Sequence, residues 1–236
     1  MQKTNEKTLI NFSSKTWMMH CLGTFMPLLL VCAVLFFFPA KALSTDTLQD
    51  EILTAIEKKY TGTEFQADFS QVSKLEALEV TETASGKAWF RHPGKMRWLY
   101  LDPERHEIIT NGKTLWIYRP DQAQVMRGDA QKFFKAGAGG AFLSDIGLIR
   151  KNFTIQLKAA TATHATLLLT AKQKNPDMVS ILIHVSRTTH EIEQATTRNA
   201  YGDTTLFEFS NIKFTPTDAS TFEFKIPEGS NIVEMD

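Results

Sequence analysis

The stretch from Gly86 to Tyr118 constrains the fold of this chain more than any other part. It holds three of the four tryptophans, and it alternates apolar with polar residues around two turn signals. Alternation with a period of two is typical of a β-strand with one buried face. The turns are His92-Pro93-Gly94-Lys95 and Asn111-Gly112, and the second dipeptide suits the left-handed backbone of a tight hairpin. The stretch therefore predicts consecutive antiparallel hairpins.

The first 42 residues have the pattern of an export signal. Three lysines supply positive charge, and the run from Leu22 to Phe38 carries none. Ala40 and Ala42 then form an A-x-A cleavage signal, so we expect cleavage after Ala42 and a mature chain of residues 43–236. An uncleaved membrane anchor is the alternative, because the apolar run is close to the minimum length for a membrane span.

Charge and cysteine content exclude several classes of function. The chain has 26 basic and 26 acidic side chains, so it lacks the positive surface expected of a nucleic-acid-binding protein. Its two cysteines, Cys21 and Cys32, lie in the predicted export signal. The mature chain would then have no disulfide, no thiolate metal site and no cysteine nucleophile.

The mature chain is predicted to contain one helix followed mostly by strands. Ser44 or Thr45 can cap a helix that runs to about Lys59, with apolar residues at helical spacing. Strands are expected at about 65–71, 84–92, 96–101, 105–110, 113–119 and 123–127, and again at 152–158, 164–172, 178–186, 190–198, 203–214 and 221–225. Between these two groups, residues 129–136 and 141–150 indicate two short helices, joined by a glycine-rich link at 137–140.

This succession of elements favours one sheet. About eleven strands in meander order, without crossover helices between neighbours, predict a large antiparallel sheet that must curl. The helix before the sheet and the two inserted helices would cover its concave face. The predicted class is α+β, with a single domain over residues 43–236.

The Asn111-Gly112 turn predicts which side chains point inward. If these two residues form the whole turn, Ile108 opposes Leu115, and Ile117 lies on the same face. We assign that face to the concave side of the sheet. Trp116 would then point outward, to a solvent-exposed rim. Ordinary core packing is the alternative for each of the inward residues.

Four sequence motifs resemble a known family. Besides GKAWFRHPGKMRW at 86–98 and NGKTLWIY at 111–118, the chain has FQADFSQ at 65–71 and FEFKIPEGSNI at 222–232. Together, and in this order, they resemble the LolA family of periplasmic lipoprotein carriers. The resemblance covers nearly the whole mature chain.

The resemblance implies a half-open β-barrel with an α-helical lid over an apolar cavity. It also implies a non-enzymatic carrier in the periplasm of a Gram-negative bacterium, which binds the acyl chains of lipoproteins and takes them from the inner to the outer membrane. Such a carrier is a monomer without a cofactor or metal. Its partners would be an inner-membrane LolCDE-type ABC transporter and an outer-membrane acceptor, either a LolB-type receptor or the membrane itself.

The candidate site follows from the strand faces and from the resemblance. The cavity would be lined by apolar side chains of the first helix and the first strands, namely Ile52, Ile56, Phe65, Phe69, Phe90, Met96, Trp98, Tyr100, Ile108, Leu115 and Ile117. The lid would add Phe133, Phe134, Phe142, Leu143 and Ile146. A lid flanked by Gly137, Gly139 and Gly140 can move.

The expected lid latch departs from the family pattern. LolA-like chains have an arginine just before the hairpin proline, and it holds the closed lid by hydrogen bonds to backbone carbonyls. That position is His92 here. Either His92 holds the lid with fewer donors, or Arg91, which lies on the opposite face of the strand, replaces the missing arginine.

Two other classes remain open from the sequence. A periplasmic regulatory module of the RseB type would share the half-barrel and bind partner proteins or lipoprotein signals, and a second, C-terminal domain would favour it. A LolB-type receptor would need a lipid-attachment cysteine, which Val31-Cys32 does not provide.

No catalytic constellation is indicated. His190-Glu191 is followed by Gln194 where a zinc-binding helix needs a second histidine. Ser85-Gly86 and Ser144-Asp145 lack the context of a serine nucleophile. We therefore expect a binding protein and not an enzyme.

Overall fold

The computed structural model describes residues 45–136 and 139–235. The predicted export signal and its cleavage after Ala42 lie outside these residues. The described residues belong to one unit, residues 42–236. Within them, no helix is both long and apolar enough to cross a membrane.

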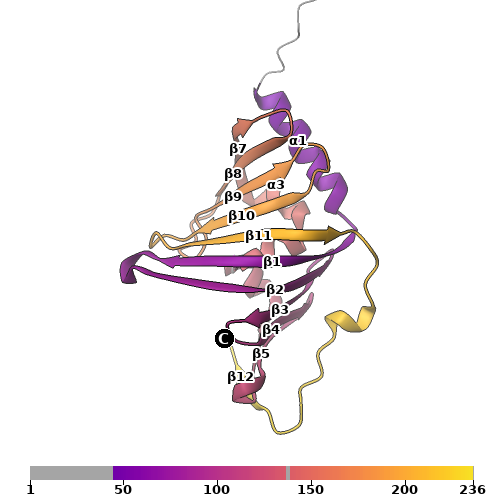
Figure 1. The fold of residues 1–236 in the computed structure, drawn as a ribbon, viewed down its shortest axis with the longest axis vertical. Coiled ribbons are helices and arrows are strands. Elements are labelled where there is room, and N and C mark those ends of the chain that lie inside the picture. The colour runs from indigo at the N-terminus through magenta and orange to yellow at the C-terminus, as the bar shows by residue number, and fades with distance from the viewer. Residues whose placement is uncertain (1–44, 137–138, 236) are drawn as a thin grey trace, which may run out of the picture. The chain divides into compact units, whose positions relative to one another are not determined.

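A helix precedes two groups of strands, which are separated by short helices (Figure 1). The first group is α1 (Thr45–Tyr60), β1 (Glu64–Leu75), η1 (Glu76–Leu78), β2 (Val80–Arg91), β3 (Lys95–Asp102), β4 (His106–Asn111), β5 (Thr114–Arg119), η2 (Pro120–Gln122) and β6 (Gln124–Asp129). The short helices are α2 (Ala130–Ala136), η3 (Gly139–Ser144), η4 (Ile146–Leu148) and α3 (Ile149–Asn152). The second group is β7 (Phe153–Ala160), β8 (His164–Ala171), β9 (Ser180–Ser186), β10 (Ile192–Arg198), β11 (Thr204–Lys213), η5 (Ala219–Phe222) and β12 (Asn231–Glu234).

The twelve strands found in the described ranges form one open, curled sheet in the order β12-β6-β5-β4-β3-β2-β1-β11-β10-β9-β8-β7. The expected class, a single curled and mostly antiparallel sheet with a few helices, is confirmed. The connectivity differs from the predicted single meander. Two meanders, β1–β6 and β7–β11, join where β1 pairs with β11, and β12 pairs with β6 in parallel.

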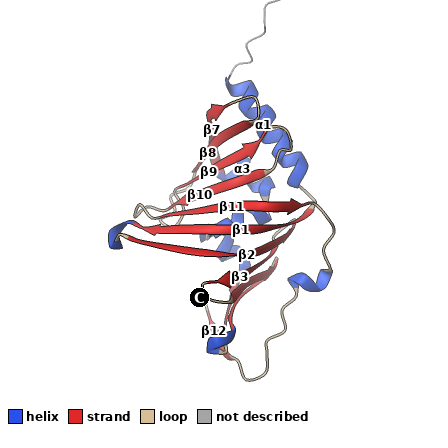
Figure 2. Ribbon diagram, viewed as in Figure 1, coloured by secondary structure: helices blue, strands red, loops and turns tan. Residues whose placement is uncertain are grey.

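This order places β6 and β7 at opposite sides of the sheet. The chain between them must therefore cross the sheet, and we call its described residues, 130–136 and 139–152, the lid. Figure 2 shows α3 and the neighbouring short helices behind the sheet. The lid begins where Asp129 Oδ1 accepts hydrogen bonds from the backbone N–H groups of Gln131 and Lys132, at 2.6 and 3.1 Å. A side-chain acceptor at this position stabilises a helix start.

Two predicted elements are wrong. Residues 141–150 were expected to form one helix, but they fall into parts of η3, η4 and α3. Residues 221–225 were expected to form a strand, but Thr221 and Phe222 belong to η5 and residues 223–225 are in neither a helix nor a strand. This helical turn begins after Asp218, whose side chain accepts a hydrogen bond from the backbone N–H of Ser220. The last strand is instead β12, which the sequence analysis did not predict.

The face of the sheet that the lid covers, called here the inner face, holds the main core. In β1, Phe65, Ala67 and Phe69 are buried on this face. Phe69 is paired with Gly86, where an added Cβ would lie 2.0 Å from the backbone oxygen of Leu99 and 3.1 Å from the Phe69 ring. Glycine is therefore required at position 86, because a larger residue would displace the neighbouring strand or the ring.

The opposite, outer face has an apolar layer of its own. Ile109 and Val125 are fully buried there, and the C-terminal segment, residues 214–230, covers them with Phe222. The ring of Phe224, from the same segment, lies 6.0 Å from that of Trp116, between centroids. Trp116 points outward as predicted, but it is half-buried beneath the C-terminal segment and does not form a solvent-exposed rim.

Candidate functional site

An apolar cluster fills the space between the inner face, α1 and the lid. It contains eight of the eleven residues proposed for the cavity, namely Ile52, Ile56, Phe65, Phe69, Phe90, Met96, Trp98 and Tyr100. The lid residues Leu143 and Ile146 are buried in the same cluster, and Ile108, Phe133, Phe134 and Phe142 pack against it partly buried. Leu115 and Ile117 share the face of Ile108 but lie outside the cluster, Leu115 buried and Ile117 half-buried.

The register of β4 with β5 explains why Leu115 and Ile117 lie outside the cluster. Ile108 pairs with Ile117, and Thr110 pairs with Leu115, whereas the sequence predicted that Ile108 opposes Leu115. The Asn111 side chain accepts hydrogen bonds from the backbone N–H groups of Lys113 and Thr114, at 3.0 and 2.9 Å, and so lengthens the turn. The shift is two residues along the pair, which leaves every side chain on its predicted face.

Aromatic rings fill the middle of the cluster. Phe65 and Phe90 stack with their centroids 4.5 Å apart. Trp98 lies 4.7 Å from Phe69 and 5.2 Å from Phe207, between centroids. Such edge-to-face and offset contacts are favourable in addition to the burial of area. The rings therefore pack against one another beneath the lid and fill the space between the sheet and the lid.

The second half of the sheet contributes as much of the inner face as the first, and the predicted site omitted it. Its buried residues in the cluster include Ala165, Leu167, Leu169, Ile181, Ile183, Val185, Ile192, Ala195, Phe207 and Phe209. The signal was present, because these strands alternate with the same period of two. The missing information was the pairing of β1 with β11, which makes the two halves one surface.

The β2–β3 turn holds the lid at η3. The ring of His92 is hydrogen-bonded to the backbone of Leu143, and the backbone N–H of Gly94 donates to the oxygen of Ser144 at 2.8 Å. Thr110 Oγ1 in turn donates to the oxygen of Gly94 at 2.7 Å, which fixes the turn on the sheet.

His92 is neutral in this setting. Burial lowers its pKa to about 4, although the hydrogen bond to Leu143 acts in the opposite direction. Its Nε2 atom is buried and has no hydrogen-bond partner among the described residues.

Arg91 does not replace the family's latch arginine. Its Nη2 atom donates both to Glu64 Oε2, at 3.1 Å, and to the backbone oxygen of Thr217, on the outer face. Its Nε lies 2.7 Å from Glu64 Oε1, an ion pair whose angle does not suit a hydrogen bond. The guanidinium also lies 5.0 Å from the ring centroid of Phe222. Arg91 therefore holds the C-terminal segment, because strand alternation directs it away from the lid.

The other end of the lid is fastened to α1. Arg150 Nε lies 2.8 and 2.9 Å from the two carboxylate oxygens of Glu57, and its terminal nitrogens donate to Asp50 at 2.6 Å and to Thr54 Oγ1 at 2.8 Å. These contacts are exposed to solvent, so each is individually weak. The lid is thus held by polar contacts at its two ends and by apolar packing between them.

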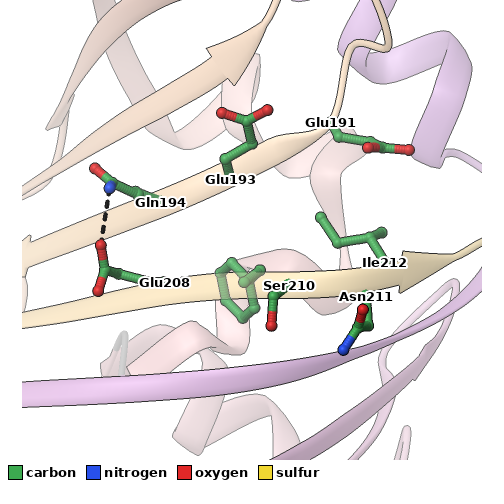
Figure 3. Close-up of a pocket in the computed structure, with 8 residues that line it drawn as sticks. Glu191, Glu193, Gln194, Glu208, Ser210, Asn211 and Ile212 are labelled. Atoms are coloured by element: carbon green, nitrogen blue, oxygen red, sulfur yellow. Dashed lines mark hydrogen bonds between the residues drawn. The ribbon is translucent and has the colours of Figure 1, made fainter.

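Two shallow pockets lie on the outer face. One, of about 310 Å³, is lined mostly by polar residues of β10 and β11, among them Glu193 and Glu208, and by Glu191 just before β10 (Figure 3). The other, of about 320 Å³, lies over β1, β2 and β11 and includes Asp68, Lys87 and Trp89. Neither is the apolar cavity that the sequence predicted.

Comparison with known proteins identifies the family. Residues 61–225 match the family described as "Outer membrane lipoprotein carrier protein LolA". The outer-membrane lipoprotein carrier protein of Cupriavidus pinatubonensis is 30% identical over 210 residues, which cover 86% of this chain and 96% of that protein. The protein of the same name from Nitrosomonas europaea is 30% identical over 197 residues, covering 83% and 91%.

A solved structure shares the fold. An uncharacterized conserved protein from Thermus thermophilus superimposes with a TM-score of 0.53 at 13% identity, over 79% of this chain and 98% of that one. The open curled sheet with its covering helices is the fold that the sequence motifs led us to expect, and residues 61–225 match the model of the same family. The chain belongs to the LolA family of outer-membrane lipoprotein carrier proteins.

Proposed function

We propose that this protein carries lipoproteins by enclosing their acyl chains between the inner face of the sheet and the lid. The single observation that supports this proposal is the apolar cluster, which joins residues of the sheet, α1 and the lid in one continuous surface. Removing apolar chains from water is favourable by about 0.8 kcal/mol per CH₂ group. Acyl chains would take the place that the lid residues occupy in the closed form.

The polar contacts of the lid suit reversible binding. A few hydrogen bonds at His92, Gly94 and Arg150 hold the closed form, and each is worth roughly 0.5–1.5 kcal/mol or less. A ligand can therefore open the lid at a cost that its own burial offsets. The cargo can also be released, because the lid residues cover the cluster again when it leaves.

The further features of the proposal follow the family. The protein would act in the periplasm of a Gram-negative bacterium, as a monomeric carrier without enzymatic activity. It would receive lipoproteins from an inner-membrane ABC transporter of the LolCDE type. It would deliver them to an acceptor at the outer membrane, either a LolB-type receptor or the membrane itself. The names of the relatives and the closed apolar interior support this assignment.

Binding of a fluorescent long-chain fatty acid tests the proposal. We expect the wild-type protein to bind it, and Met96→Glu to lose at least tenfold in affinity, because an unpaired carboxylate on the inner face is costly to bury. Leu99→Glu is the matched control, since Leu99 is on the same strand but on the outer face. Ile108→Glu, at a partly buried inner position, provides a second test if Met96→Glu does not fold.

The outcome distinguishes an apolar cluster that binds acyl chains from one that is only a hydrophobic core. Equal affinities for wild type, Ile108→Glu and Leu99→Glu would contradict an inner binding site. Native mass spectrometry of protein purified from the periplasm extends the test to the cargo. A bound acylated lipoprotein is the expected species, and its mass identifies it.

A further inference from the structure

Large apolar side chains are exposed together at one end of the sheet. Among the described residues with such side chains, Leu78, Val80, Leu101, Val179 and Tyr201 all lie at or beside the end where β1 and β10 finish and β2, β9 and β11 begin. Leu78 and Tyr201 are the most exposed, at 69% and 70%. Single exposed apolar residues are ordinary, but a group of them at one place is not.

Three of the five form a tip. The β1–β2 hairpin carries Leu78 and Val80, and Figure 1 shows it extending beyond the neighbouring strands. The β10–β11 turn, which carries Tyr201, is tied to it, because the backbone N–H of Glu76 donates to Asp203 Oδ1 at 2.9 Å. We call residues 75–80 and 199–203 the tip. Leu101 lies on β3, and Val179 comes immediately before β9, on the two sides of the tip.

We propose that the tip is a docking surface for a net-neutral lipid bilayer rich in phosphatidylethanolamine. The inference rests on the proposed function, since a carrier of acyl chains must meet the membranes between which it works. It assigns the tip the role of a peripheral contact that holds the carrier at the lipid surface.

The shape of the tip favours a bilayer over a folded protein partner. The apolar side chains of the tip come from two turns, and the exposed Glu79 lies between Leu78 and Val80 in one of them. A stable protein interface needs roughly 800 Å² of complementary surface on each partner. A lipid surface adapts to single projecting side chains, and tyrosine is typical of the interface between lipid and water. β1 is already paired on both sides, so its edge offers no place for an added strand.

The charge of the tip decides the kind of lipid. Glu76 and Glu79 in the tip, and Glu82 beside it, are exposed and form no ion pair with any described residue. The exposed Lys74 next to the tip offsets one of these three negative charges, so the group remains net negative. Carboxylates are repelled by the negative potential of an anionic leaflet. They tolerate a net-neutral surface, and they complement the ammonium groups of phosphatidylethanolamine. Binding should therefore depend on apolar insertion and should weaken as anionic lipid is added.

Flotation with liposomes tests the inference. The full chain is expressed, and the protein is purified from the periplasm and mixed with vesicles of phosphatidylethanolamine and phosphatidylcholine. We expect wild-type protein to float with them, and the triple variant Leu78→Ser, Val80→Thr, Tyr201→Ser to float at least fivefold less. The double variant Ile232→Ser, Val233→Ser is the matched control, since these exposed apolar residues lie in β12, away from the tip, and should leave flotation unchanged.

The same samples distinguish this inference from the proposed function. The triple variant should bind the fluorescent fatty acid as wild type does, because the tip is outside the apolar cluster. Absence of flotation by wild type, or equal flotation of the triple variant, would overturn the docking surface and leave the carrier function intact. Flotation that increases with anionic phosphatidylglycerol would overturn the charge argument. A photo-crosslink from position 78 to a protein, without flotation, would assign the tip to a protein partner instead.

Discussion

The imidazole of His92 is hydrogen-bonded to the backbone of Leu143, so the β2–β3 turn is joined to the lid through a group that can titrate. The neighbouring bond from Gly94 to Ser144 involves backbone atoms only and does not titrate in the ordinary range of pH. The lid is therefore held at this point by one contact that depends on pH and one that does not.

The first prediction is that acid opens the lid. Burial lowers the pKa of His92 to about 4, whereas an unfolded histidine titrates near 6.5. The closed form therefore binds the proton less tightly than the open chain, and its stability is complete above about pH 6.5 and declines as pH falls toward 4. Hydrogen exchange in residues 142–149, corrected for intrinsic rates, should show more opening across this window. His92→Phe should remove the dependence, and an equal dependence in that variant would assign it to another group.

The second prediction concerns the strength of the latch. His92→Leu removes one neutral hydrogen bond, worth roughly 0.5–1.5 kcal/mol, and should increase lid opening about two- to tenfold at pH 7. His92→Arg should tighten the closed form, because guanidinium offers more donors to the lid carbonyls. Arg91→Leu is the control: exchange should increase in residues 216–223, which Arg91 contacts, and should stay unchanged in the lid. Unchanged lid exchange in both His92 variants would show that packing alone holds it.

The third prediction is that the α3 end of the lid depends on Arg150. Arg150→Met breaks the contacts with Asp50, Thr54 and Glu57 while keeping much of the side-chain length. Because these groups are exposed, we expect a loss of about 0.5–1 kcal/mol in the free energy of unfolding. Fatty-acid association should become faster, since the lid opens more often. Lys151→Met, one position along α3 and without these contacts, should change neither quantity, and a similar effect of both variants would point to the loss of charge alone.

The fourth prediction is that acid also releases the C-terminal segment. Burial by itself raises the pKa of the Glu64 carboxyl, but hydrogen bonds from the backbone N–H of Thr217 and from Arg91 lower it below its usual value of 4.5. Because the pKa of Glu64 is lower in the folded than in the unfolded state, its stabilisation of the C-terminal segment is complete above the usual value of 4.5. This stabilisation is lost as pH falls through the folded-state pKa. Exchange in residues 216–223 should increase below about pH 4.5 in wild type. Glu64→Gln should show increased exchange already at pH 7 and a smaller further increase in acid, which is due to Asp218, because hydrogen bonds from Ser220 lower the pKa of that carboxyl as well.

The fifth prediction compares two neighbouring residues on opposite faces. Leu115→Glu should weaken fatty-acid binding, because Leu115 is buried on the inner face. Trp116→Glu should leave binding unchanged but lower the melting temperature, since it places a carboxylate beneath Phe224. Thermal denaturation and fluorescence titration of both variants provide the two readouts. Equal losses of binding would mean that the two faces are not separate.

Alternation within strands could be read from the sequence, whereas contacts between distant segments could not. Met96, Trp98 and Tyr100 were placed correctly because period-two patterning is local. The register at Ile108 was missed by two residues because the Asn111 side chain lengthens the turn. Trp116 was expected at a solvent-exposed rim because the residues near it in the sequence give no indication that Phe224, far away in the chain, covers it. The inward residues of β8–β11 were omitted for the same reason, since their partner strand β1 is far away in sequence.

The pairing of β1 with β11 has a consequence for how the chain folds. Phe69 pairs with Phe209, so the two meanders can form early from local contacts, while the seam between them must close a loop that includes the lid and the nine strands β2–β10. Loop closure of this length is slow compared with hairpin formation. Until the seam closes, each half exposes one apolar face and one unpaired edge to other chains. Newly synthesised molecules should therefore be most prone to aggregate before the β1–β11 seam forms. Substitutions at Phe69 or Phe209 should lower the yield of folded protein more than equally buried changes within one meander.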